Sequence, residues 1–185
     1  MVINTQKEII YTMGEIAESR SKETGNHVKR VALYSELFAL YYGLENKEAE
    51  MLKQASPMHD IGKVGIPDNI LLKPGALSAA EFTLMKEHAK LGADALIDCM
   101  QESECNVEIN FLSTAIDIAH YHHEKWNGQG YPNGLSGDNI PLSARLMALA
   151  DVFDALISRR CYKDPVTFED SVNIILDGLN VQTVF

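Results

Sequence analysis

The sequence HDIGKVGIPD occupies residues 59–68 and places a histidine directly beside an aspartate at the end of a predicted helix. That helix is predicted to begin at Asn46, which is a suitable N-cap, and its apolar residues recur at helical spacing. A loop containing Pro67 and Pro74 follows. Imidazole and carboxylate both bind divalent ions, so the pair raises the question of which other side chains lie beside it.

A second stretch, HHEKWNGQGYP at residues 122–132, brings two adjacent histidines to the end of another predicted helix. Glycines and prolines then define a long loop over about residues 125–140. A loop of this length in a compact helical domain is usually either functional or disordered. Its aromatic residues, Trp126 and Tyr131, argue against disorder, so the loop is predicted to be functional.

The rest of the chain has the pattern of an almost entirely helical protein. The sequence SAAE at 78–81 is a capping box that opens a long helix. An earlier helix is predicted to stop near Gly43, Pro141 can begin another in its first turn, and a last helix starts near Thr167. No alternation typical of strands persists, so we predict an all-α helical bundle.

The composition suits one domain with a hydrophobic core: 185 residues, 46% of them hydrophobic and 23% charged. Residues 1–20 are predicted to form a lead-in or linker helix and residues 21–185 the domain; a plain packed first helix is an equally open interpretation. No signal peptide or membrane segment is evident, and the three cysteines lack CxxC spacing. We therefore expect reduced thiols and a cytoplasmic location.

The net charge of -10 comes from 16 basic and 26 acidic residues. Such a surface repels nucleic acid and anionic lipid, so neither is expected as a partner. An anionic substrate would need locally concentrated positive charge, and bound divalent metals are the strongest source of it.

Histidines and carboxylates recur at the ends of the predicted inward-facing helices. A single histidine on an apolar face is usually a satisfied core residue, but burying many unpaired polar groups would cost several kcal/mol in total. Coordination to metal removes that cost. Because a carboxylate has two oxygens, Asp60 beside His59 can link two ions, and two ions can clamp a phosphodiester and activate a water.

Taken together, the two stretches resemble the HD-GYP family of the HD phosphohydrolase superfamily. The order is specific: HDIGKVGIPD, LLKPGALSAAEFTLMKEHAKLGA, HHEKWNGQGYP and then ARLMALADVFDAL. The resemblance covers about residues 23–177. It implies an HD-type helical bundle with two or three metal ions in its core, often iron or manganese, and a long GYP loop. It also implies hydrolysis of cyclic di-GMP to pGpG or GMP, in a signalling output domain.

The resemblance also assigns metal ligands. The matching positions are Glu23, His27, His59, Asp60, His88, His122, His123 and Asp151. Asp60 matches the residue that bridges two ions, and Glu23 matches one that goes with a third ion. For Glu23, a solvated charge paired with a nearby lysine is the other open interpretation. Asp60 and Lys63 are the expected catalytic residues, with Lys63 contacting phosphate and assisting the leaving oxygen.

Substrate contacts are expected from Lys63, Arg145 and Tyr131. Arg145 could bind a phosphate as a planar fork or form a salt bridge to an acidic helix. Tyr131 could stack on a guanine, or serve the partner recognition that the family's GYP loop implies; Trp126 is predicted to be a hydrophobic lid residue. His120 is left out of the ligand set. It lies two residues before His122, so on a helix its side chain would point roughly away from that of His122.

Two further classes of function stay open. One is an HD phosphohydrolase that acts on another nucleotide or cyclic dinucleotide. The other is a catalytically weak binding or interaction module, which missing ligands would favour, and none is missing. The end of the chain, DGLNVQTVF, lacks an FDP-like segment common in the family, so an atypical C-terminus is expected. Protein partners at the GYP loop and a homodimer are further expectations.

Overall fold

The structure is a computed structural model that describes residues 2–20, 25–102, 109–158 and 165–180. Its α-helices are α1 (Val2–Ser19), α2 (Gly25–Tyr42), α3 (Asn46–Ala55), α4 (Asp68–Leu71), α5 (Ala79–Glu102), α6 (Ile109–Tyr121), α7 (Leu142–Ile157) and α8 (Phe168–Asn180). Three short 3-10 helices join them: η1 (Ser56–Met58), η2 (Ile61–Gly65) and η3 (Gly137–Asn139). Within these ranges every regular element is a helix, and the β-type pairing is limited to an isolated bridge between Asn127 and Ser136. The prediction of an all-α fold is therefore confirmed.

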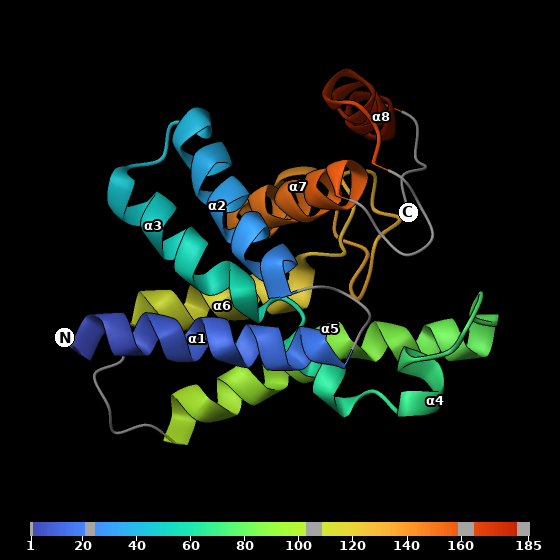
Figure 1. The fold of residues 1–185 in the computed structure, drawn as a ribbon, viewed down its shortest axis with the longest axis horizontal. Coiled ribbons are helices and arrows are strands. Elements are labelled where there is room, and N and C mark those ends of the chain that lie inside the picture. The colour runs from blue at the N-terminus through green and yellow to red at the C-terminus, as the bar shows by residue number, and fades with distance from the viewer. Residues whose placement is uncertain (1, 21–24, 103–108, 159–164, 181–185) are drawn as a thin grey trace.

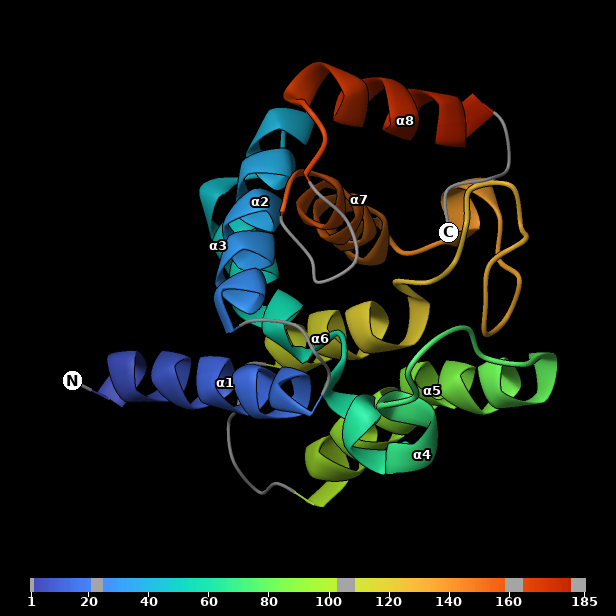
Figure 2. The same ribbon diagram turned by 45° about the vertical axis from the view of Figure 1, so that its right-hand side comes forward.

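The helices are arranged around α6, which packs against α3, α5 and α7 (Figure 1). On one side of α6 lie α1, α4 and α5; on the other lie α2, α3 and α7, with α8 packed on the outside of α7 (Figure 2). None of the helices in the described ranges combines the length and the apolar character that a membrane crossing requires.

The apolar core lies between α2, α3, α6 and α7. Its buried residues are Val31, Ala39, Ala49, Leu52, Ala55, Met58, Ala115, Ile118, Leu146, Met147 and Ala150. Many of them are alanines, which allow the helices to approach closely. At one end of this core lie His59, His88 and His122, which are only 1%, 2% and 4% exposed. Three buried imidazoles need polar partners, and those partners define the site described below.

Two predicted helix ends are confirmed. Gly43 follows the last residue of α2 with a φ of 102°, the left-handed conformation that glycine adopts without strain. At the start of α8, the backbone N–H of Asp170 donates to Thr167 Oγ1 at 3.1 Å. The prediction of Asn46 as an N-cap was wrong: Asn46 is already helical, and Glu45 precedes it in an extended conformation. Glu45 is the N-cap because its own backbone N–H donates a hydrogen bond to the Glu48 carboxylate, in the first turn of the helix.

The capping box at the start of α5 is also confirmed. Ser78 N–H donates to Glu81 Oε2 at 2.7 Å, and Glu81 N–H donates to Ser78 Oγ at 3.3 Å. Lys73 Nζ adds an ion pair to the same carboxylate at 2.6 Å. These hydrogen bonds, from Lys73 first and then from Ser78, lower the pKa of Glu81 to about 2.

The variant Glu81→Gln is expected to lower Tm near pH 7 and to lose this effect in acid. A carboxyl group whose folded pKa is depressed stabilises the fold above its unfolded pKa of 4.5, and that contribution fades as the pH falls toward about 2. Circular dichroism melts of wild type and variant at several pH values from 7 to 3 measure the difference, with Glu87→Gln on the exposed face of α5 as control. A Tm difference that stays constant over this range would contradict the expectation.

The C-terminal half of α1, the predicted lead-in helix, packs closely on the following elements. It contacts α2, η1 and η2, and both Ala17 and Glu18 are 1% exposed. A Cβ atom on Gly14 would lie 2.7 Å from the carbonyl oxygen of Pro57 in η1, so only glycine permits this approach. This part of α1 therefore lies beside the segment that carries His59 and Asp60.

Candidate metal centre

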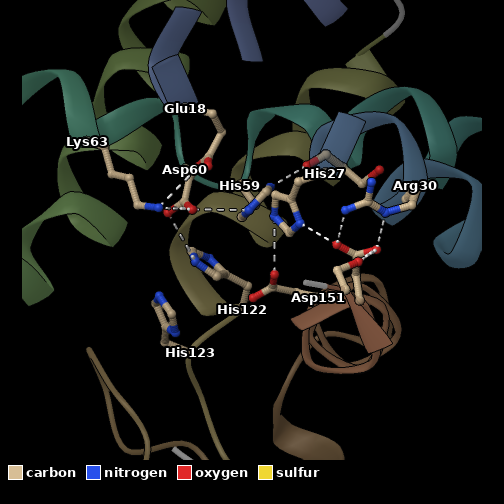
Figure 3. Close-up of polar contacts among 12 residues, drawn as sticks. Glu18, His27, Arg30, His59, Asp60, Lys63, His122, His123 and Asp151 are labelled. Atoms are coloured by element: carbon tan, nitrogen blue, oxygen red, sulfur yellow. Dashed lines mark hydrogen bonds and ion pairs between the residues drawn. The ribbon is translucent and has the colours of Figure 1, made fainter. Parts of the chain in front are cut away.

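The two sequence stretches meet at the Asp60 carboxylate (Figure 3). Asp60 Oδ1 lies 3.2 Å from His88 Nε2 and 3.8 Å from His122 Nε2. The other oxygen, Oδ2, lies 3.2 Å from His59 Nε2. One carboxylate thus presents its two oxygens to two different groups of imidazoles.

Three groups of side chains in the described residues could hold an ion; one of them, Glu18 with His59 and Asp60, shares its last two members with the other two. The other two we call site A, composed of His27, His59 and Asp151, and site B, composed of Asp60, His88, His122 and His123. Within each cluster one ligand atom per residue lies within 4.8 Å of the others. The members come from α2, the turn after η1, α5, the turn after α6, and α7. The structure therefore brings together seven of the eight predicted ligands; the eighth, Glu23, lies outside the described residues.

The histidine rings are oriented by hydrogen bonds at their outer nitrogens. Backbone carbonyl oxygens lie near Nδ1 in three cases: Ser56 O at 2.8 Å from His59, Met85 O at 2.7 Å from His88, and Ile118 O at 2.9 Å from His122. Since a carbonyl oxygen can only accept, Nδ1 must carry the proton in each ring. In a neutral ring the Nε2 lone pair then points into the cluster, as metal ligation requires.

The residues present fit a metal ion. In the described part of the chain His59 Nε2, Asp60 Oδ1 and His122 Nε2 are buried and have no hydrogen-bond partner. Orphaned buried polar atoms are costly, and a cation in the cluster would take all three as ligands once His59 has released its Nε2 proton. The donor set combines imidazole nitrogen with carboxylate oxygen and contains no thiolate, which suits iron, manganese or zinc and disfavours a closed structural zinc site.

Burial and charge set the protonation of these rings. Burial lowers the pKa of His122 to about 3 and also lowers that of His88, so both rings are neutral at physiological pH. Burial would lower the pKa of His59 as well, but the adjoining Asp60 carboxylate raises it to about 9. A metal that binds His59 must therefore displace a proton from it.

Lys63 reaches the same carboxylate, on the side away from site B. Its ammonium lies 2.6 Å from Asp60 Oδ2 and 3.1 Å from Glu18 Oε1 (Figure 3). The structure thus places Lys63 beside Asp60, the other residue expected to be catalytic, whereas the contact with Glu18 was not predicted. The sequence contained one signal for Glu18: it follows Gly14 by four residues, so the two lie on the same face of α1, the face that packs against η1.

Asp154 is a second residue that the sequence interpretation missed. Its carboxylate lies 2.8 Å from His27 Nδ1 and accepts hydrogen bonds from Arg30 Nε at 2.6 Å and Nη2 at 2.9 Å. Burial would raise the pKa of Asp154, but the hydrogen bonds from His27 and Arg30 lower it to about 2. It lies one turn after Asp151, so the i, i+3 spacing of the two aspartates was the available signal.

The long loop folds back over site B. The buried Glu124 carboxylate accepts the backbone N–H groups of Asn133 at 2.7 Å and Leu135 at 2.9 Å. Tyr131 N–H donates to His123 O at 3.2 Å, and the two rings stack with centroids 4.6 Å apart. The loop is therefore tied to the histidine pair, and Tyr131 covers a predicted metal ligand.

Three other residues considered from the sequence lie in the loop or contact it. Arg145 Nη1 donates to Asp138 Oδ1 at 2.8 Å, so the salt bridge that was one of its two interpretations is present, with an acceptor in η3. The Arg145 guanidinium also lies 5.5 Å from the centre of the Trp126 ring, which is 50% exposed. His120 Nε2 is 3.1 Å from Asn133 Oδ1, and His120 belongs to neither cluster, in agreement with its omission from the ligand set.

Comparison with known proteins gives a consistent match over most of the chain. The sequence model of a family described as HD domain matches residues 12–180. A 3'3'-cGAMP-specific phosphodiesterase 2 of Vibrio cholerae is 51% identical over 165 residues, which is 89% of this chain and 30% of the relative. A probable cyclic di-GMP phosphodiesterase of the same organism is 50% identical over 182 residues, 94% of this chain and 41% of the relative.

A solved structure agrees with the fold. An HDG"Y"P protein from Bdellovibrio bacteriovorus superposes with a TM-score of 0.57 at 25% identity, covering 82% of this chain and 52% of the other. The chain spans less than half of the length of the two Vibrio relatives.

Proposed function

Because this chain belongs to the HD domain family, we propose that it is a metal-dependent phosphodiesterase that hydrolyses cyclic di-GMP to pGpG, GMP or both. The resemblance to HD-GYP proteins is confirmed by the family match and the named relatives. The observation that carries the proposal is the Asp60 carboxylate, whose two oxygens face separate clusters of inward-pointing imidazoles. This arrangement suits a pair of ions that shares one ligand.

We propose that sites A and B each hold one ion and that Asp60 bridges them. When bound, the ions would supply Lewis acidity and a water of lowered pKa, the chemistry that hydrolysis of a phosphodiester requires. Iron or manganese is proposed, since both suit imidazole and carboxylate ligands. A third ion at Glu23 stays a prediction.

Lys63 is proposed to contact the phosphate and assist the leaving ribose oxygen. Its ammonium already lies against Asp60, so a phosphodiester placed beside the bridging carboxylate would be within its reach. Tyr131 is proposed to line the substrate side of site B, because it covers His123. For Arg145 to bind phosphate, the substrate would have to replace Asp138 as its acceptor.

A specific observation favours a second substrate. The relative at 51% identity is named for 3'3'-cGAMP and the one at 50% for cyclic di-GMP, so identity does not separate the two. Both are cyclic dinucleotides with the same kind of diester, and they would use the same metal chemistry. A cytoplasmic location, protein partners at the GYP loop and a homodimer are further proposals.

The proposed function is tested by product chromatography on anaerobically purified protein loaded with iron or with manganese. Cyclic di-GMP and 3'3'-cGAMP are incubated separately, and metals are counted by elemental analysis. We expect two or three ions per chain and conversion of cyclic di-GMP to pGpG or GMP, which should stop when a chelator removes the metal.

Faster cleavage of 3'3'-cGAMP than of cyclic di-GMP would make 3'3'-cGAMP the preferred substrate and would leave the proposed metal-dependent hydrolysis unchanged. Fully loaded protein that cleaves neither compound would refute the proposed function.

A further inference from the structure

Arg20, the residue that follows α1, binds the segment after His59 and Asp60. The Arg20 guanidinium donates to Val64 O at 2.6 Å and to Ile66 O at 3.2 Å, and it pairs with the Asp68 carboxylate at 2.6 Å. These acceptors are carbonyl groups at the end of η2 and the first side chain of α4. Together with the close contact at Gly14, they fix the end of α1 beside Lys63.

At this place two buried carboxylates share one ammonium group. The Glu18 side chain is 1% exposed and that of Asp60 is 10% exposed, and Lys63 Nζ lies between them at 3.1 and 2.6 Å (Figure 3). Burial, and then the charge of Asp60, raise the pKa of Glu18, and the opposing effect of Lys63 only reduces that rise. The ammonium, which lies within ion-pair distance of both carboxylates, offsets part of their mutual repulsion.

The two acids are not equivalent toward the metal ions of the proposed function. Asp60 faces both clusters, so its negative charge would be shared with cations there. A lysine held by Asp60 alone would then feel net repulsion from those cations. Glu18 holds the ammonium from the side of α1, and its charge counteracts that repulsion.

We propose that Glu18 is a positioning residue that keeps the Lys63 ammonium beside the bridging carboxylate, where the lysine can meet a substrate phosphate. This inference rests on the proposed function for its catalytic part. It makes α1 part of the reaction site, since the helix contributes the side chain that holds the lysine.

A double-mutant cycle tests the proposal in kinetics. The variants are Glu18→Gln, Lys63→Met and the pair combined, with Glu15→Gln as control because Glu15 lies on the same helix and pairs with the exposed Lys29. Each is assayed with cyclic di-GMP and with bis(4-nitrophenyl) phosphate, and metals are counted by elemental analysis. We expect Glu18→Gln to lower kcat about 10- to 100-fold with an unchanged metal count, since small displacements of a reacting group carry losses of this size. In the Lys63→Met background the same substitution should change kcat less than about twofold, because a residue acting through Lys63 has nothing left to position.

A second cycle on metal-free protein needs no substrate. Glu18→Gln should lower Tm by roughly 5 °C in the wild-type background and by much less in the Lys63→Met background, as loss of a charge-assisted buried hydrogen bond predicts. If the wild type leaves both cyclic dinucleotides intact but cleaves the artificial diester, the proposed function fails and the kinetic cycle still decides the role of Glu18. If neither ester is cleaved, the Tm cycle decides whether Glu18 holds Lys63.

Two results would overturn the proposal. An equal kcat loss or an equal Tm loss from Glu18→Gln in both backgrounds would show that Glu18 does not act through Lys63. Loss of about one metal ion per chain in Glu18→Gln would instead make Glu18 a metal ligand, which its distance from His59 and Asp60 also permits.

Discussion

Replacing Asp60 by alanine is expected to lower the rate of cyclic di-GMP hydrolysis at least about 10³-fold and to leave fewer than one metal ion per chain. The reason is the position of the carboxylate between site A and site B. In the proposed two-ion centre, its removal would take a ligand from both ions and leave their charges unscreened from each other. Elemental analysis and product chromatography on the same preparation measure the two effects. The variant should stay folded, because the apolar core is untouched. Four histidine rings also keep the hydrogen bonds at Nδ1 that orient them, those of His27, His59, His88 and His122.

The control for this prediction is Asp94→Ala, which removes an exposed carboxylate that pairs with Lys90 on the surface of α5. It should keep the metal content and the rate of wild type, because an exposed pair of this kind contributes little. A full complement of ions and full activity in Asp60→Ala would remove the basis of the proposed two-ion centre.

Much of the fold could be predicted because helices impose local rules. A capping box, a glycine after a helix and the 3.6-residue period each depend on residues a few positions apart, so Ser78, Gly43 and Thr167 indicate real helix ends. The side chains that gather in sites A and B could be singled out because their order along the chain resembles that of a known family. Asn46 was misassigned because the neighbouring glutamate caps the helix with its own local hydrogen bond.

The residues around the ligands could not be predicted in the same way. Glu18 meets a lysine 45 positions later, and Asp154 meets His27 across 127 positions. No local pattern encodes such pairings, since they depend on how whole helices pack. The position of Tyr131 against His123 likewise follows from loop hydrogen bonds to Glu124, which are visible only once the loop is folded.

Replacing Asp154 by alanine is expected to lower the free energy of unfolding by about 3 kcal/mol and to weaken metal binding at site A about 10- to 100-fold. The substitution removes the common acceptor of His27 Nδ1 and of the Arg30 guanidinium, and it leaves Arg30 half-buried beside a cavity. His27 would also lose the hydrogen bond that fixes the orientation of its ring toward Asp151. Urea unfolding of metal-free protein and titration with manganese measure the two losses separately.

A compensated variant separates stability from metal binding. In the combined variant Arg30→Met with Asp154→Leu, apolar groups replace both partners of the buried ion pair, so much of the lost stability should return. Metal affinity at site A should stay low, because His27 still lacks its acceptor. Asp138→Ala is the matched control, since it removes an exposed aspartate from an arginine pair and should change neither quantity measurably. If the compensated variant recovered wild-type metal affinity together with its stability, Asp154 would serve only to neutralise Arg30, and the orientation of His27 would have to come from the packing of α2 against α7 alone.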